Sequence, residues 1–295
     1  MKQVHSHKDV SVAVLGIGLM GERLAVRLLA AGYSLTAWNR SPEKAQALVP
    51  HGARVTLTAA EAVRDSQFVI LMLENGRVVG DVLFEQGVAG ALQPGAVVID
   101  MSSIGPQEAR DHAQRLAELG VQHLDAPVSG GTLGAERGSL AIMCGGEQQT
   151  FDQAQELFSA LGRPVRVGPH GAGQLAKLAN QVIVGTTIGA VAEALLLARR
   201  GGADPASVIQ ALAGGFADSP ILRLHGQRMV DGDYETRGRA ETQLKDLNNA
   251  IIAADQNGSP TPYAHLTAGL FDELIRHDGD IDHSGLMREF ERRTR

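Results

Sequence analysis

The sequence predicts an α/β fold with an N-terminal parallel-sheet domain, followed by an all-helical C-terminal domain joined to it by a long helix. Two observations predict this class. Apolar strand candidates alternate with helix-compatible segments over the first half of the chain, whereas long segments with helical periodicity dominate from Gly171 onward. The turn-forming run from Gly168 to Gly171 separates the two patterns. We therefore expect one domain over residues 1–169 and a second over residues 170–295.

The elements of the first domain follow from short apolar runs that end at turns. We expect strands over residues 10–15, 34–38, 68–73 and 97–100. We expect helices over residues 20–31, 42–49 and 110–119. This alternation is typical of a parallel sheet covered by helices on both faces.

Composition limits the possible functions. The chain has 295 residues, of which 44% are hydrophobic and 20% charged, as in ordinary globular proteins of about two domains. Its formal net charge of −6 argues against a nucleic-acid partner, because such proteins usually carry a basic surface. The one cysteine, Cys144, lies in an apolar run, so we expect a buried core thiol and a cytoplasmic protein.

No targeting or membrane segment is expected. Residues 1–9 are polar and lack the apolar core of a signal peptide. The apolar region over residues 182–198 is interrupted by Glu193 and is near the shortest length that spans a bilayer. We interpret it as a helix buried in protein.

A glycine-rich loop follows the first strand. Its sequence is Gly16, Ile17, Gly18, Leu19, Met20 and Gly21. A GxGxxG pattern that follows a strand and opens a helix is typical of a Rossmann dinucleotide site, because the glycines let the pyrophosphate approach the helix N-terminus. The first domain is therefore expected to be a Rossmann domain.

The end of the second strand favours NADP, with NAD as the alternative. NAD sites typically carry Asp or Glu there, but this chain has Asn39, Arg40 and Ser41, and no carboxylate before Glu43. Arg40 can pair with a 2′-phosphate, to which Asn39 and Ser41 can donate hydrogen bonds.

Three further segments carry polar groups. Ser129, Gly130 and Gly131 form a loop after a strand candidate, suited to a carboxylate or hydroxyl, although such a loop alone is more often a simple turn. Lys177 is followed at helical spacing by Asn180 and Gln181 within apolar sequence. Burial disfavours the charged form of a lysine, which makes Lys177 a candidate acid or base.

The segment Lys245, Asp246 and Asn248 is the last of these clusters. It precedes a helix-compatible stretch over residues 249–254, so spacing alone predicts a solvated helix start.

These segments, in this order, make the chain resemble the β-hydroxyacid dehydrogenases from about residue 10 to residue 291. The resemblance implies that Lys177 is the catalytic lysine and that Ser129, Gly130 and Gly131 bind substrate. It places Lys245 near the nicotinamide. Residues 177–181 and the tail at Asp282 look most like the tartronate semialdehyde reductases of the family.

The resemblance also places Ser103 near nicotinamide and substrate, and Leu73 and Glu74 beside the cofactor. Two positions depart from the family pattern. Many members have Asn where this chain has Gln181, so either Asn180 or Gln181 partners the lysine. Members often have proline where this chain has Glu74, and this carboxylate alters the contacts near the nicotinamide. A homodimer or homotetramer is implied, with the helical domain at the contact.

The expected reaction is NADPH-dependent reduction of a short carbonyl acid, such as tartronate semialdehyde, to the hydroxyacid. Lys177 protonates the alkoxide and acts as the base in reverse. The alternatives are 3-hydroxyisobutyrate or glyoxylate/succinic semialdehyde oxidation–reduction, imine reduction, or NADPH binding without catalysis. Retention of Lys177 argues against the last two. No metal is expected.

Overall fold

Six parallel strands bring their carboxyl ends to one edge of a sheet. The computed structural model describes residues 9–293. Most of residues 1–9, the stretch expected to lack a signal peptide, therefore lies outside the described residues. The parallel strands run in the order β3-β2-β1-β4-β5-β6. Their bounds are β1 Ser11–Leu15, β2 Ser34–Trp38, β3 Arg54–Val55, β4 Phe68–Leu71, β5 Val97–Asp100 and β6 Gln122–Asp125. This order is that of a Rossmann fold, which confirms the predicted class.

Three strands extend the sheet beyond β6 and were not predicted. They are β7 Val128–Ser129, β8 Leu140–Gly145 and β9 Gly162–Gly168. β8 runs antiparallel to β6 and β7, and β9 is parallel to β8. The residues of β9 alternate between half-buried and exposed, so this edge strand lacks the apolar run that marks the inner strands.

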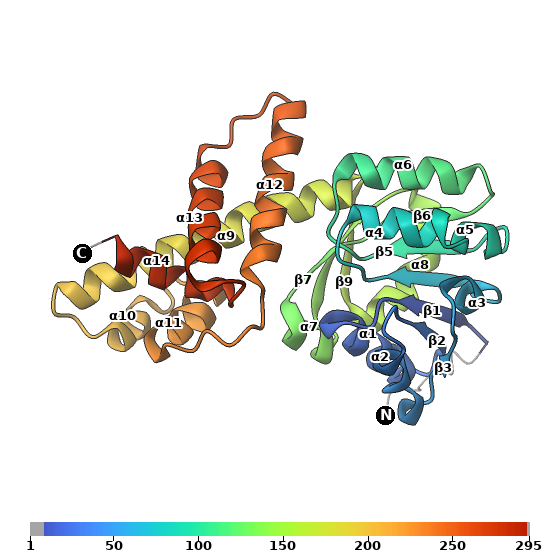
Figure 1. Ribbon diagram of the computed structural model, residues 1–295, viewed down its shortest axis with the longest axis horizontal. Coiled ribbons are helices and arrows are strands. Elements are labelled where there is room, and N and C mark those ends of the chain that lie inside the picture. Colours follow the sequence, from blue (N-terminus) through green and yellow to red (C-terminus); the bar gives the residue numbers. More distant parts are fainter. Residues whose placement is uncertain (1–8, 294–295) are drawn as a thin grey trace. The chain divides into compact units, whose positions relative to one another are not determined.

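Helices cover both faces of the sheet (Figure 1). Alternate residues of β1 enter separate cores, Val12 and Val14 in one, Ala13 and Leu15 in the other. The helices of the first core are α1 Leu19–Ala30, α2 Pro42–Gln46, α7 Gly131–Arg137 and α8 Gln148–Leu161. The helices of the second core are α3 Ala59–Val63, α4 Gly76–Gly80, the π-helix η2 Asp81–Glu85, α5 Val88–Ala91 and α6 Pro106–Ala117. The short 3-10 helix η1 spans Val49–His51.

The first core also contains the single cysteine. Cys144 is 0% exposed, which confirms the buried thiol. Burial raises the pKa of this thiol to about 12.

The chain forms two compact units, residues 1–177 and residues 178–295. The division falls inside the long helix α9, Ala172–Arg200. The predicted boundary after residue 169 lies between the end of β9 and the start of this helix.

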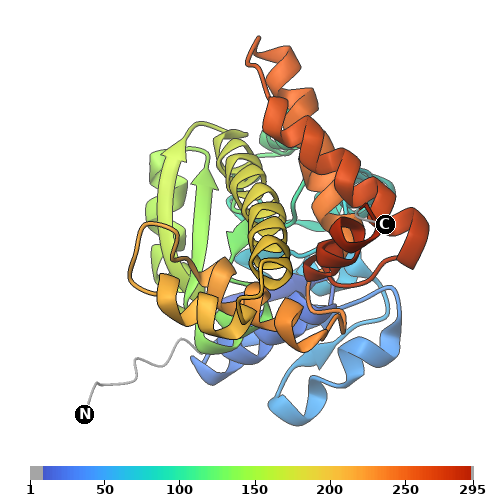
Figure 2. The same ribbon diagram turned by 90° about the vertical axis from the view of Figure 1, so that its left-hand side faces the viewer.

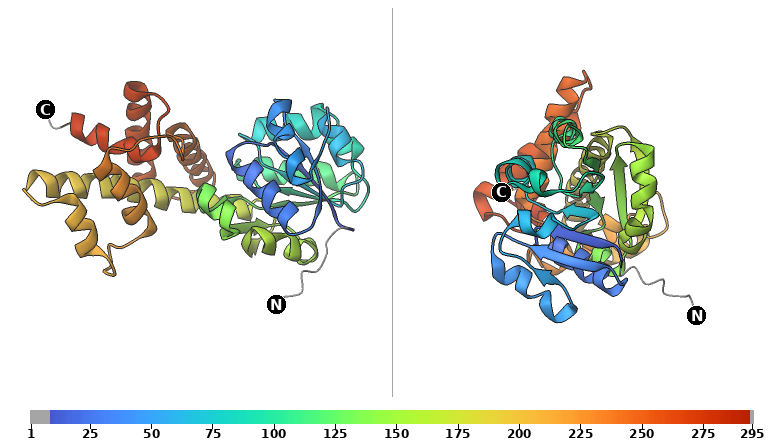
Figure 3. Two further views of the ribbon diagram at one scale, coloured as in Figure 1. Left: turned by 90° about the horizontal axis from the view of Figure 1, so that it is seen from below. Right: turned by 90° about the vertical axis from the view of Figure 1, so that its right-hand side faces the viewer.

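The second unit is helical (Figures 1 and 2). After α9 it contains α10 Pro205–Leu212, the π-helix η3 Leu222–Gly226, α11 Gln227–Asp231, α12 Ala240–Gln256, α13 Pro262–Asp278, the 3-10 helix η4 His283–Gly285 and α14 Leu286–Arg292. α12 and α13 lie side by side, and their buried faces meet α9 around Ile188, Leu247 and Phe271. The lower part of this unit, with α10 and α11, is seen from below in Figure 3.

α9 is less buried than predicted. Within the described residues it is the one helix long and apolar enough to cross a membrane by length and composition, and 44% of its apolar window is buried. Ile183 and Leu197 on this helix are 66% and 75% exposed. One such helix is weak evidence for a membrane span, because the central helix of a core has the same composition.

Candidate active site

The glycine loop between β1 and α1 is shaped by close contacts with its neighbours. Gly16 has a φ of +102°, and a Cβ atom there would lie 2.3 Å from the carbonyl oxygen of Met72. A Cβ atom on Gly21 would lie 1.9 Å from the carbonyl oxygen of Gly16. Both positions therefore require glycine for packing within the protein.

Gly18 differs from its two companions. A Cβ atom on Gly18 would meet no protein atom within 4 Å, and its φ of −95° is open to any residue. Gly18 is the N-cap of α1, and no side chain caps this end. Backbone N–H groups at a helix N-terminus without a side-chain cap bind phosphate, so the space beside Gly18 fits a dinucleotide pyrophosphate.

The end of β2 holds the glycine loop in place. Asn39 Oδ1 accepts a hydrogen bond from the N–H of Ile17 at 2.8 Å, and Asn39 Nδ2 donates to the carbonyl oxygen of Ser41 at 3.0 Å. The side chain predicted to donate to a 2′-phosphate is thus engaged with the backbone of both loops. Arg40 is exposed and Ser41 half-buried.

The loops after β4 and β5 are joined by a buried serine. Ser102 Oγ accepts a hydrogen bond from the N–H of Leu73 at 2.9 Å, and the N–H of Ser102 donates to Asp100 Oδ1 at 2.9 Å. The neighbouring Ser103 is half-buried, and Glu74 is exposed. Leu73 and Glu74 lie beyond β4, which ends at Leu71, two residues earlier than predicted.

Two buried carboxyl groups stand at the ends of β5 and β6. Asp100 and Asp125 are paired across these strands, and both are 0% exposed. Burial raises the pKa of Asp100 to about 7, opposed by the hydrogen bonds from Ser102. Burial also raises the pKa of Asp125, opposed by backbone hydrogen bonds from Gly171 and Gln174.

Asp125 anchors the first turn of α9. Its Oδ1 accepts from the N–H of Gly171 at 2.8 Å, and its Oδ2 accepts from the N–H of Gln174 at 2.9 Å. A carboxylate at this end satisfies otherwise unpaired N–H groups and interacts favourably with the helix dipole. Lys177 follows one turn later and is half-buried.

Gln174 connects α9 to the loop after β5. Its Nε2 donates to the carbonyl oxygen of Ser102 at 2.9 Å, and its Oε1 accepts from the N–H of Ile104 at 3.1 Å. Gln174 is 0% exposed. The first turn of α9 is therefore fixed to the backbone around Ser103.

The predicted substrate loop depends on two glycines. Gly130 and Gly131 have φ values of +136° and +60°, a region that side-chain-bearing residues rarely adopt. Ser129 ends β7 and is half-buried, while both glycines are exposed. The two glycines of this loop are thus accessible from solvent.

A polar network in the second unit links α9 to α12. Gln181 Nε2 donates to Asp246 Oδ2 at 2.7 Å and to Gln243 Oε1 at 3.3 Å, and Gln181 Oε1 accepts from Asn180 Nδ2 at 2.8 Å. Lys245 Nζ lies 3.2 Å from Asp246 Oδ1. Asp246 is 1% exposed and lies inside α12, so the predicted solvated helix start is wrong. Spacing missed it because Gln181, which donates to Asp246, lies on another helix.

The first unit thus brings together the glycine loop, Leu73, Ser103 and the turn of α9 that ends at Lys177. Asn180, Gln181 and Lys245 belong to the second unit. Sequence reasoning named no role for Ser102, Asp100 or Gln174. Their roles depend on contacts between segments that are distant in the sequence.

A second cluster, His225, Asp282 and His283, places its ligand atoms within 4.8 Å of one another. Asp282 Oδ1 already accepts from Ser284 and lies 2.8 Å from the guanidinium of Arg228. Its Oδ2 accepts from the N–H groups of Arg237 and Gly238. A carboxylate with these donors organises the loop before α14 and has little capacity left for a cation.

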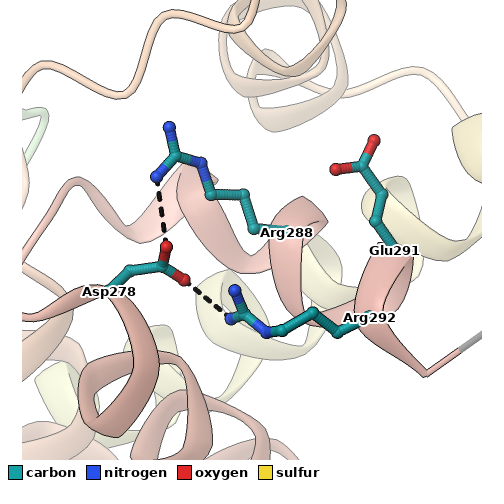
Figure 4. A pocket seen from close by; sticks show the side chains of 4 residues that line it. All are labelled: Asp278, Arg288, Glu291 and Arg292. Carbon is teal, nitrogen blue, oxygen red and sulfur yellow. Dashed lines mark hydrogen bonds and ion pairs between the residues drawn. The ribbon is translucent and has the colours of Figure 1, made fainter.

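A surface pocket of about 330 Å³ also lies in the second unit, lined by Asp278, Arg288, Glu291 and Arg292. Figure 4 shows both arginines directed toward Asp278. Arg288 and Arg292 lie 3.1 Å and 2.7 Å from its carboxylate. The two arginines are paired with Asp278, and Glu291 is paired with Arg199 outside the pocket. None of the predicted site residues lines this pocket.

The fold and the glycine loop agree with two family models. The model described as the NAD binding domain of 6-phosphogluconate dehydrogenase matches residues 11–171. The model described as NAD-binding of NADP-dependent 3-hydroxyisobutyrate dehydrogenase matches residues 171–290. The chain belongs to the 3-hydroxyisobutyrate dehydrogenase family. It is therefore an NAD(P)-dependent oxidoreductase that acts on hydroxyacids.

Known members of the 3-hydroxyisobutyrate dehydrogenase family match over nearly their whole length. The 2-hydroxy-3-oxopropionate reductase of Escherichia coli (strain K12) is 39% identical over 285 residues, 96% of this chain and 97% of that protein. The NAD-dependent L-serine dehydrogenase of Pseudomonas aeruginosa is 34% identical over 274 residues, 90% of this chain and 92% of that protein. A solved 3-hydroxyisobutyrate dehydrogenase from Mycobacterium tuberculosis with L-serine has a TM-score of 0.86 at 28% identity, covering 95% of this chain and 99% of that one.

Proposed function

We propose that this enzyme reduces a short-chain carbonyl acid, a semialdehyde such as tartronate semialdehyde, to the hydroxyacid with NADPH, reversibly. Lys177 is the general acid/base. The observation that carries the proposal is the anchoring of the first turn of α9 by Asp125 and Gln174, which fixes Lys177 relative to the strand ends. The similarity to the Escherichia coli reductase supports the substrate class.

Separate residues carry out proton transfer and substrate binding. When bound, the reduced nicotinamide supplies a hydride to the carbonyl carbon. Lys177 donates a proton from Nζ to the developing alkoxide oxygen and accepts it in the reverse direction, a contribution of about 10²–10⁴-fold. Ser129 and the N–H groups of Gly130 and Gly131 bind the substrate carboxylate. Ser103 contacts the substrate beside the cofactor.

Asn180 is the better partner for Lys177. Gln181 uses both atoms of its amide within the second unit, on Asp246, Gln243 and Asn180. We therefore assign the orientation of the substrate oxygen to Asn180, which is half-buried. Gln181 supports it by fixing its amide and by holding Asp246 beside Lys245, the residue expected near the nicotinamide.

NADP is the proposed cofactor. Arg40 is exposed at the end of β2, where it can pair with a 2′-phosphate, and Ser41 follows it. The cofactor residues of the loop are Gly16, Ile17, Gly18, Leu19, Met20 and Gly21. NAD remains the alternative, since the related L-serine dehydrogenase is named as NAD-dependent.

The proposed oligomeric state rests on the family resemblance, and the proposed compartment rests on the cysteine content. We expect a cytoplasmic homodimer or homotetramer whose partner is a small carbonyl or hydroxy acid. The single buried thiol suits a reducing compartment. The net charge of −6 argues against a nucleic-acid partner.

A substrate panel tests the proposal. We compare initial rates for the wild type, Lys177→Ala and the surface control Lys44→Ala. The substrates are tartronate semialdehyde, glyoxylate, succinic semialdehyde and methylmalonate semialdehyde, each assayed with NADPH and with NADH. We expect the highest kcat/KM with tartronate semialdehyde and NADPH. Lys177→Ala should lose at least about 10²-fold in kcat while its fluorescence titration with NADPH is unchanged. Near-full activity of Lys177→Ala would refute the assignment, and imine reduction in its place would favour the imine reductase alternative.

A further inference from the structure

Gln174 is hydrogen-bonded to the backbone on both sides of Ser103 and precedes Lys177 by three residues. Its side-chain amide is hydrogen-bonded to the carbonyl oxygen of Ser102 and the N–H of Ile104, the backbone groups on either side of Ser103. Lys177 lies three residues further along the same helix, about 4.5 Å along the helix axis at 1.5 Å per residue. One side chain thus joins the backbone that carries Ser103 to the turn that carries Lys177.

The backbone of Gln174 is fixed as well. Its N–H donates to Asp125, which also accepts from Gly171. With both the main chain and the side chain of Gln174 hydrogen-bonded, a shift of the first turn of α9 would break several buried hydrogen bonds at once. A buried polar group that loses its partner in this way destabilises the protein, so the turn is held in one position.

The chemistry of this site requires an amide. One partner is a backbone acceptor and the other a backbone donor, so the side chain must donate with one atom and accept with the other. A methionine has similar length but can do neither. A glutamate accepts at both atoms and repels the carbonyl oxygen of Ser102 when ionised. A protonated glutamic acid can donate to Ser102 and accept from Ile104, as the amide does.

We propose that Gln174 is a positioning residue for the reaction, which sets the distance between Ser103 and Lys177. This inference rests on the proposed role of Lys177. Gln174 itself touches neither the substrate nor the reacting atoms. Its effect is on the placement of the proton donor relative to the loop beside the nicotinamide.

The test compares Gln174→Met and Gln174→Glu with the wild type and with Gln93→Glu, a control on the exposed surface of the same unit. For each variant, kcat, KM and the NADPH dissociation constant are measured from pH 5.5 to pH 9. We expect Gln174→Met to lose about 10²-fold in kcat, the scale of a misplacement of about 1 Å, with NADPH binding unchanged within about twofold.

Gln174→Glu supplies the decisive readout. Its activity should approach that of the wild type at low pH, where the acid reproduces both hydrogen bonds, and fall toward that of Gln174→Met as the new carboxyl ionises. The titratable and charged groups around this site are Asp100 and Asp125, with Glu108, His170, Cys144 and Arg110 near them, and Lys177 one turn further along α9. The wild type and Gln93→Glu contain all of these groups. Their pH profiles of kcat therefore show the effect of these groups alone, and any additional change in Gln174→Glu comes from the new carboxyl.

The outcomes separate the two proposals. Wild-type kcat in Gln174→Met, or a Gln174→Glu profile that matches the wild type at every pH, would overturn the positioning role. If Gln174→Met fails to fold, the pH profile of Gln174→Glu decides alone. Activity in Lys177→Ala would instead overturn the proposed function.

Discussion

The N–H of Ile17 donates a 2.8 Å hydrogen bond to the side chain of Asn39, which joins the glycine loop to the end of β2. The amide nitrogen of Asn39 donates in turn to the carbonyl oxygen of Ser41. One side chain therefore shapes the surface on which both the pyrophosphate and the ribose of a dinucleotide bind in this fold. The contacts of Asn39 in the structure are with the protein backbone, whereas we propose that the neighbouring Arg40 pairs with the cofactor.

Asn39→Ala and Arg40→Ala should separate these roles. Loss of the Asn39 amide removes its hydrogen bonds to Ile17 and Ser41 and loosens the loop, so we expect KM to rise about 10-fold for both NADPH and NADH. Arg40→Ala removes the cation that we propose pairs with the 2′-phosphate, so KM should rise for NADPH and stay nearly constant for NADH. Steady-state kinetics with both cofactors measure the difference. An equal effect of Arg40→Ala on both cofactors would contradict NADP preference.

Gly18→Ala and Gly21→Ala should fail in different ways. The Cβ atom of Ala at position 18 meets no protein atom, so the variant should fold with nearly unchanged Tm but bind NADPH at least about 10-fold more weakly. At position 21 the Cβ atom lies 1.9 Å from the carbonyl oxygen of Gly16, so this variant should lose stability. Thermal unfolding and NADPH titration test the pair. Tight NADPH binding by Gly18→Ala would show that the pyrophosphate binds elsewhere.

Asn180→Ala should mainly reduce activity, whereas Gln181→Ala should mainly reduce stability. Asn180→Ala is expected to lose about 10²-fold in kcat/KM with a small change in Tm. Gln181→Ala leaves the buried Asp246 without its 2.7 Å donor, so we expect a loss of about 1–3 kcal/mol of stability. Kinetics and denaturant unfolding of both variants check this. If Asn180→Ala keeps full activity while Gln181→Ala loses it in a fully stable protein, Gln181 is the substrate amide.

Asp100 makes stability depend on pH. Its pKa is raised from 3.8 to about 7 in the folded protein by burial, so the folded state binds this proton more tightly than the unfolded chain. Stability should therefore fall as pH rises from about 4 to about 7 and then level off. In Asp100→Asn this fall is absent. We expect the Tm of the variant relative to the wild type to be higher at pH 8 than at pH 5 by on the order of a few degrees. A constant difference in Tm across this range would refute the assignment.

The sequence predicted the parallel strands β1, β2, β4 and β5, because each is a short, mostly apolar segment that ends at a turn, although Ser34 and Thr36 interrupt the apolar pattern of β2. It did not predict β9, an edge strand whose Arg163 and Arg166 interrupt any apolar pattern. Edge strands are set by pairing with a neighbour, here β8, and carry a weaker local signal.

The sequence predicted those parts of the candidate site that are formed by residues close together in the chain. Gly16 to Gly21 form a local loop, and their spacing is visible in the sequence. The contacts of Gln174 reach across 70 and 72 residues to Ile104 and Ser102, and those of Gln181 reach across 65 residues to Asp246. No periodicity in the sequence reports such pairings, so the residues that hold the site together emerge only from the fold.

The placement of Cys144 has a practical consequence for spectroscopy. It is the single sulfhydryl of the chain, and at neutral pH its raised pKa and full burial keep it as an unreactive thiol. A cysteine introduced on the surface would then be the sole target of maleimide dyes or spin labels. Probes can be attached one at a time to either unit without first removing a native residue.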